Sequence, residues 1–393
     1  MMPEAMKSLE IPPAGRPARF PALDGVRGVA ILLVLFHQLS RVGTPDLAAR
    51  VVEYALDFGW VGVQLFFVLS GFLITGILLD SRGAPGYLRS FFVRRVLRVF
   101  PLYFGALVLV LGILPETGLV PRSWREDQLW YWLFLSNWFQ PFNEGKLPHL
   151  WSLAVEEQFY LAWPFVVLGL SAAPLLRLCL FLSAAAFAGR CAMVAGGLSP
   201  EAIYMFTPSR VDALLLGAAG AACLRLPGGI PAWITARRLW AFALGAGAAG
   251  FLASRGFQRT GALGQTVGYA VLAAVFAGIL LALVREQEES PRPSRVARVL
   301  GSAPMRALGK YSFGMYVFHK PLHDLVGKPA LAALGLGGPL AVAPGLAYAA
   351  IGIAVVTAAG GLSYHLFERH FLALKPRFGP GQPAAPVGRK GLF

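Results

Sequence analysis

The sequence is poor in charged residues. Only 14% of its 393 residues are Asp, Glu, Lys or Arg, whereas about a quarter of the residues of a soluble globular protein are charged. This scarcity, with a mean hydropathy of +0.60, excludes an ordinary soluble domain. Apolar segments of about 17–25 residues recur from near Pro21 to Leu366, and that length lets a helix cross a bilayer. The sequence therefore predicts an all-α, polytopic integral membrane protein.

Cysteines and targeting features are also scarce. The three cysteines, Cys179, Cys191 and Cys223, fall in apolar segments and lack the spacing of metal ligands, so we expect them to be buried apolar residues and expect no metal cofactor. Residues 1–20 contain neither an apolar core nor a small-residue cleavage site. We therefore expect no cleavable signal peptide, and the first span itself should direct insertion.

About ten membrane-spanning helices are predicted. A further apolar segment, 128–142, is rather short and rich in Trp and Tyr, which favour the membrane interface, so we expect it not to cross. The ten predicted spans are 23–42, 58–80, 97–114, 153–171, 174–195, 207–225, 238–254, 262–284, 310–327 and 340–366.

The distribution of basic residues orients these spans. If the N-terminus is cytoplasmic and 128–142 does not cross, 24 of the 35 Lys and Arg residues face the cytoplasm, nine face outward and two lie within spans. This distribution follows the positive-inside bias. It also explains the net charge of +15 without a nucleic-acid partner. We expect both termini to be cytoplasmic.

The chain is expected to form one transmembrane domain, 21–375, between two short terminal segments. Residues 1–20 would be a cytoplasmic N-terminal segment, and residues 376–393 a basic, disordered cytoplasmic tail. We find no inverted internal repeat of the kind common in transporters.

Ionisable residues within predicted spans are candidates for function, because burying them in a membrane is costly. His37 lies about 15 Å beyond Arg27 along the first helix, roughly halfway across the hydrocarbon. It could act as a general base or simply hydrogen-bond a neighbouring helix. The others are Glu156, Glu157, Arg190, Asp212, His319 and Lys320; for Arg210 with Asp212, and for His319 with Lys320, we favour a structural role.

Two further groups have open alternatives. Glu156 and Glu157 could be catalytic, or they could only stabilise a helix N-terminus; they point about 100° apart, so at most one can face His37. Arg95 and Arg98 share a helix face at i, i+3 spacing and could bind the phosphates of a nucleotide-containing donor. Alternatively, they only set topology and contact lipid headgroups.

Taken together, the motifs resemble the membrane acyltransferase-3 family of bacterial O-acyltransferases. They occur in the family's order over about residues 20–375. The motifs are LDGVRGVAILLVLFH, FFVLSGFLIT, FFVRRVLRVFPLY, LWSLAVEEQFYLAWP, SRVDALLLG, YSFGMYVFHKPL and YHLFERHF.

The resemblance implies a ten-helix domain that passes an acyl group, commonly acetyl, from acyl-coenzyme A to a hydroxyl, usually of a sugar. It also implies that His37 is the essential histidine, that Arg95 and Arg98 are the family's arginine pair, and that Glu156 and Glu157 are its paired glutamates. Arg27 matches the basic residue of the first motif. However, nine residues separate it from His37 where the family usually has ten, which leaves the two side chains about 80° apart.

Our hypothesis from the sequence is an acyltransferase of the bacterial inner membrane. Acyl-coenzyme A would bind from the cytoplasm to Arg95 and Arg98, and His37, oriented by one of the two glutamates, would deprotonate a hydroxyl of a carbohydrate or lipid-linked glycan. An acyl-enzyme relay is the variant of this mechanism. There are two alternatives: an acyltransferase that acts on a macrolide-like small molecule, and a transporter or flippase without catalysis.

Overall fold

Ten helices of 17 or more residues dominate the computed structural model, which describes residues 20–43, 47–143, 145–290 and 292–379. Each overlaps one of the ten predicted spans. Among the described residues there is no strand, only an isolated bridge between Val42 and Leu340. The long helices are α1 (Pro21–Leu39), α3 (Val61–Asp80), α4 (Tyr87–Leu107), α8 (Trp151–Gly169), α9 (Ala172–Ala195), α11 (Thr207–Cys223), α12 (Ala236–Ala253), α13 (Tyr269–Glu289), α15 (Ala303–Leu322) and α17 (Val342–Ser363).

Short helices connect and cap the long ones. The segment 128–142, predicted not to cross, forms only α6 (Gln128–Trp132) and α7 (Ser136–Phe139), and neither is long enough to span a bilayer. The other short α-helices are α2 (Leu47–Asp57), α5 (Leu114–Thr117), α10 (Pro200–Met205), α14 (Arg295–Leu300), α16 (Lys328–Ala333) and α18 (Arg369–Leu372).

The predicted class, an all-α multi-pass membrane protein, is confirmed. Six helical stretches are long and apolar enough to cross a membrane, while the count of ten crossings remains a prediction. α8 carries Glu156 and Glu157, and α15 carries Lys310 and Lys320, so both helices are less apolar than a simple span. The six stretches are Pro21–Leu39, Leu47–Asp80, Tyr87–Thr117, Ala172–Ala195, Gly264–Glu289 and Val342–Phe378.

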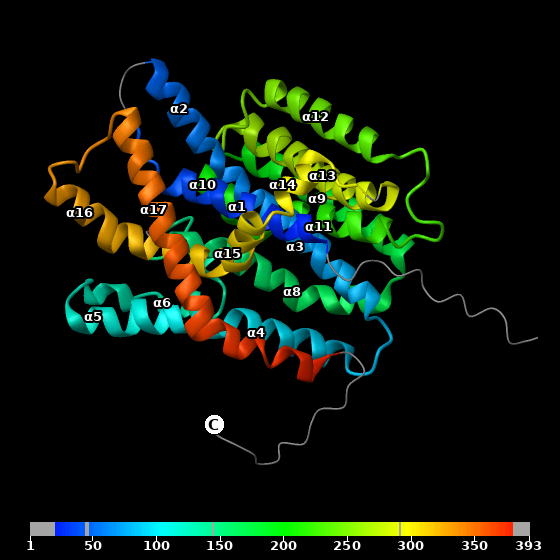
Figure 1. Ribbon diagram of the computed structural model, residues 1–393, viewed down its shortest axis with the longest axis horizontal. Coiled ribbons are helices and arrows are strands. Elements are labelled where there is room, and N and C mark those ends of the chain that lie inside the picture. Colours follow the sequence, from blue (N-terminus) through cyan, green and yellow to red (C-terminus); the bar gives the residue numbers. More distant parts are fainter. Residues whose placement is uncertain (1–19, 44–46, 144, 291, 380–393) are drawn as a thin grey trace, which may run out of the picture.

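Glycines let the central helices α3 and α11 approach closely. A Cβ atom at Gly71 would lie 1.9 Å from the carbonyl oxygen of Leu214, and one at Gly217 would lie 1.9 Å from that of Val68. Only glycine fits both places, as is common where transmembrane helices pack. Figure 1 shows α1, α3 and α11 in the middle of the bundle, with α12 and α4 on opposite sides.

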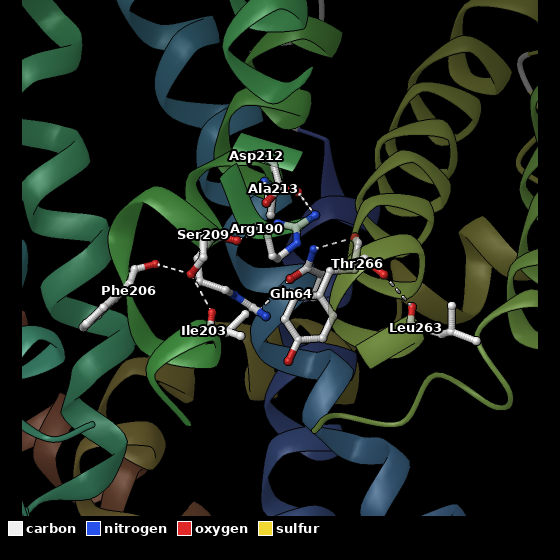
Figure 2. A network of polar contacts seen from close by, with 11 residues as sticks. Gln64, Arg190, Ile203, Phe206, Ser209, Asp212, Ala213, Leu263 and Thr266 are labelled. Carbon is white, nitrogen blue, oxygen red and sulfur yellow. Dashed lines mark hydrogen bonds and ion pairs between the residues drawn. The ribbon is translucent and has the colours of Figure 1, made fainter. Parts of the chain in front are cut away.

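Buried polar side chains tie this central pair to its neighbours (Figure 2). Arg190 of α9 forms an ion pair of 2.8 Å with Asp212 of α11, and both side chains are almost fully buried. Arg210 donates a hydrogen bond of 2.6 Å to Gln64 of α3, and the Gln64 amide donates one of 3.0 Å to the carbonyl of Tyr269 in α13. These contacts agree with the structural role favoured for Arg210 and Asp212.

The C-terminal segment packs against α4. Residues Lys375–Phe378 form a short 3₁₀-helix, and the Ser90 hydroxyl donates a hydrogen bond of 2.6 Å to the carbonyl of Phe378. The first four residues of the predicted tail, 376–379, are therefore described and lie on the bundle. The rest of that tail and nearly all of the predicted N-terminal segment lie outside the described residues.

Candidate active site

Three cavities adjoin one another inside the bundle. We call them the basic vestibule, of about 820 Å³, the glutamate cavity, of about 130 Å³, and the histidine cavity, of about 160 Å³. The charged residues of the vestibule are Asp24, Arg27, Arg94, Arg95, Arg98, Arg306, Lys310 and Lys375. The polar residues of the glutamate cavity are Arg27, Ser70, Arg95, Arg98, Ser152, Glu156, Glu157, Tyr160, Ser312 and Tyr316. Those of the histidine cavity include His37, Gln38, His149, Tyr204, Arg259, Tyr316 and His319.

Shared lining residues set the order of these cavities. Arg27, Arg95 and Arg98 line both the vestibule and the glutamate cavity. Val63 and Tyr316 line both the glutamate cavity and the histidine cavity. Since Arg27 and His37 lie ten positions apart on α1, the series extends over about 15 Å of helix. The cavities thus follow α1 from its first turns to its last.

His37 lies in the histidine cavity, against a carboxylate that the sequence analysis missed. Its Nδ1 is 3.1 Å from Oδ1 of Asp57, and the two side chains are 18% and 63% exposed. The contact lacks the geometry of a hydrogen bond, but a carboxylate this close favours the tautomer with its proton on Nδ1, which leaves Nε2 as a base. Asp57, the last residue of α2, therefore occupies the position that the sequence hypothesis gave to Glu156 or Glu157.

The two glutamates are together in the neighbouring cavity instead. Both lie in the second turn of α8 and line the glutamate cavity with Arg27, Arg95 and Arg98. The Arg95 guanidinium lies 4.6 Å from the centre of the Tyr160 ring, and the Tyr160 hydroxyl bonds that of Ser70. In the described part of the chain, neither glutamate lines the histidine cavity.

The arginines predicted to act together do share one surface. Arg95 and Arg98 project from the same side of α4, and Arg27 joins them from α1, where it pairs with Asp24 at 3.3 Å. Seven basic residues and one acidic residue line the vestibule, so its field attracts anions. Among the described residues, no group of three or more His, Cys, Asp or Glu side chains is placed to hold a metal ion.

Three polar residues in or beside these cavities were not singled out from the sequence. Asp57 directly precedes the second predicted span, at the end of the bundle where α1 ends. This position could have identified it as a neighbour of His37. His149 lies two residues before WSL, outside any predicted span, so its position did not mark it as an intramembrane charge. Tyr316 gave no signal, because its place between two cavities depends on how α15 packs.

Most of the chain matches a known family. The model of the acyltransferase domain of the acyltransferase-3 family matches residues 20–364. The chain therefore belongs to this family, which confirms the resemblance seen in the motifs. Its enzymes transfer acyl groups other than aminoacyl groups, which agrees with the predicted enzyme class.

Individual relatives are bacterial. The chain is 29% identical to a putative peptidoglycan O-acetyltransferase, YrhL, of Bacillus subtilis, over 89% of this chain and 54% of that protein. It is 28% identical to the peptidoglycan O-acetyltransferase OatA of Listeria monocytogenes, over 78% of this chain and 49% of that protein. The chain thus spans about half the length of these relatives. No solved structure matches it.

Proposed function

We propose that this chain is an integral-membrane O-acetyltransferase that moves an acetyl group from acetyl-coenzyme A to a hydroxyl of a cell-wall or other exported glycan. The observation that carries the proposal is the order of the cavities: a site for anions, then a polar passage, then a histidine base. Family membership and the names of the relatives support the reaction type and the glycan acceptor.

The donor would enter the basic vestibule. Arg95 and Arg98 are placed to bind its phosphates, with Lys310 and Lys375 adding positive charge; guanidinium groups bind phosphate through paired hydrogen bonds. The aromatic side chains of Tyr311 and Tyr364 also line the vestibule and offer a face on which an adenine ring can stack. The thin pantetheine arm would then extend through the glutamate cavity.

The chemical step would take place beside Tyr316, where the glutamate and histidine cavities meet. Nε2 of His37 accepts the proton of the acceptor hydroxyl as its oxygen attacks the thioester carbonyl. Asp57 holds the imidazole and stabilises the imidazolium that forms. The new C–O bond forms, the C–S bond breaks, and the coenzyme A thiolate leaves.

Glu156 and Glu157 would act on the thiol side of this reaction. They line the cavity through which the donor's arm passes, so we assign one of them to protonate the leaving thiolate. That proton balances the one that His37 removes from the hydroxyl. The nearby arginines compensate the charge of the glutamates.

The proposed setting is the bacterial inner membrane, with both termini in the cytoplasm. The vestibule is lined by residues that the charge distribution assigns to the cytoplasmic side, including Arg94, Arg306 and Lys310. His37 lies toward the other end of α1. A donor made in the cytoplasm would then react with an acceptor held near the outer face.

The test is transfer by the purified chain in lipid nanodiscs, supplied with labelled acetyl-coenzyme A and a peptidoglycan fragment. We expect a labelled ester on the glycan and one free thiol for each ester. His37→Gln should abolish both, while His370→Gln, an exposed histidine outside the three cavities, should not. Transfer to a macrolide and not to the glycan would contradict the acceptor, and movement of a substrate without thiol release would indicate a transporter.

A further inference from the structure

Two more imidazoles line the cavity that contains His37. His149 comes from the short 3₁₀-helix Pro148–Leu150 before α8, and His319 from the last turn of α15. Both are buried, with 6% and 0% of their surface exposed. Their ring centres are 4.8 Å apart and their planes are nearly perpendicular, at 72°. The proposed function does not use either residue.

Backbone carbonyls determine the tautomer of each ring. His149 Nε2 lies 3.2 Å from the carbonyl oxygen of Val317, and His319 Nδ1 lies 2.6 Å from that of Tyr316. A carbonyl oxygen can only accept, so both of these nitrogens carry the proton and donate it. In the neutral rings, His149 Nδ1 and His319 Nε2 are therefore bare lone pairs.

These two bare nitrogens are buried and have no hydrogen-bond partner in the described part of the chain. A buried polar atom without a partner is costly, and each such atom in a folded protein calls for an explanation. Burial, with His319 beside it, holds the pKa of His149 well below its usual value, so that ring stays neutral at physiological pH. A molecule with O–H donors, such as water or a hydroxylated ligand, satisfies both nitrogens.

We propose that His149 and His319 form a subsite that binds hydroxyl groups of the acceptor, next to the hydroxyl that His37 activates. This inference rests on the proposed function and narrows its substrate class to acceptors with several neighbouring hydroxyls, as in a sugar ring. Two hydroxyls donate to His149 Nδ1 and His319 Nε2, and a third is presented to His37. An acceptor with one isolated hydroxyl leaves both nitrogens unsatisfied and is bound less tightly.

Matched substitutions separate the lone pairs from the shape of the rings. His319→Gln keeps an acceptor oxygen near the place of Nε2, whereas His319→Phe keeps a ring and removes the acceptor. His149→Asn and His149→Phe make the equivalent pair for Nδ1. His323→Phe is the control, since His323 follows on the same helical stretch, bonds the Tyr348 hydroxyl and does not line the histidine cavity.

The readout is steady-state transfer in nanodiscs, with disaccharide fragments of peptidoglycan as acceptors. We expect each Phe variant to raise the acceptor KM about 3- to 10-fold, the effect of one lost hydrogen bond, with an unchanged donor KM. The Asn and Gln variants should recover most of the affinity, and His323→Phe should behave as the unmodified protein. Bound acetyl-coenzyme A reports that each variant is folded.

Analogues of the disaccharide with one hydroxyl at a time replaced by hydrogen complete the test. The analogue that lacks the hydroxyl bound by His319 should bind the unmodified protein more weakly than the complete disaccharide does. The His319→Phe variant should bind the analogue and the complete disaccharide equally well. An unchanged acceptor KM in both Phe variants would overturn the inference, as would equal losses in the Phe and amide variants. If the unmodified protein transfers nothing to the fragments, the proposed function itself has failed, and this outcome is distinct from the others.

Discussion

Replacing Asp57 by asparagine tests the orientation of His37 directly. At 3.1 Å, two opposite unit charges attract by about 1 kcal/mol in water and about 5 kcal/mol at an effective dielectric constant of 20. Because 63% of the Asp57 side chain is exposed, solvent screens the pair, and we take the lower part of this range, about 1.4–2.8 kcal/mol. Losing that stabilisation of the imidazolium should slow transfer about 10- to 100-fold.

The assay measures thiol release and ester formation as a function of acetyl-coenzyme A concentration. Asp57→Asn should lower kcat and leave the donor KM unchanged, since the vestibule is remote from α2. Glu53→Gln removes a carboxylate one turn earlier on the same exposed helix and should have no effect. If Asp57→Asn turned over as fast as the unmodified protein, Asp57 would not orient the base, and the reasoning would be refuted.

Three other substitutions test the donor site and the packing. Arg95→Ala should weaken acetyl-coenzyme A binding about tenfold, as measured by calorimetry. Arg89→Ala, on an exposed part of the same helix, should not. If Arg95→Ala and the unmodified protein bound the donor equally well, Arg95 would have only a topological role. Asp212→Asn leaves a buried guanidinium unpaired and should cost about 3–5 kcal/mol of stability, seen as a loss of folded protein in detergent. Gly71→Ala should destabilise the folded protein by about 1–3 kcal/mol and lower its melting temperature. Gly361→Ala is the control, because a Cβ atom there would meet nothing within 4 Å. Equal melting temperatures of the two variants would contradict the close approach of α3 and α11.

The architecture was largely predictable because it depends on local properties. Hydropathy located all ten long helices, because each contains a long apolar run, although only six helical stretches are long and apolar enough to cross a membrane. Segment 128–142 forms two short helices and no long one, as its length indicated. The i, i+3 spacing of Arg95 and Arg98 placed them on one surface for the same reason, as spacing along a helix fixes relative direction.

The partner of His37 could not be predicted in this way. The sequence offered Glu156 and Glu157 as carboxylates within the membrane, but which carboxylate meets His37 depends on how α1, α2 and α8 pack. The rotation and depth of α8 bring both glutamates to the arginines of α4. Asp57 reaches His37 because α2 folds back beside the end of α1.

The sequence by itself determined the class of protein, the position of its helices and its family, and it supplied candidate site residues. These depend on composition and on spacing along single helices, both of which can be read directly from the chain. Only the tertiary structure decided which side chains share a cavity, because helix rotation and depth follow from packing between segments far apart in sequence. It separated the glutamates from His37, supplied Asp57 in their place, and brought His149 and His319 together with lone pairs that need a donor.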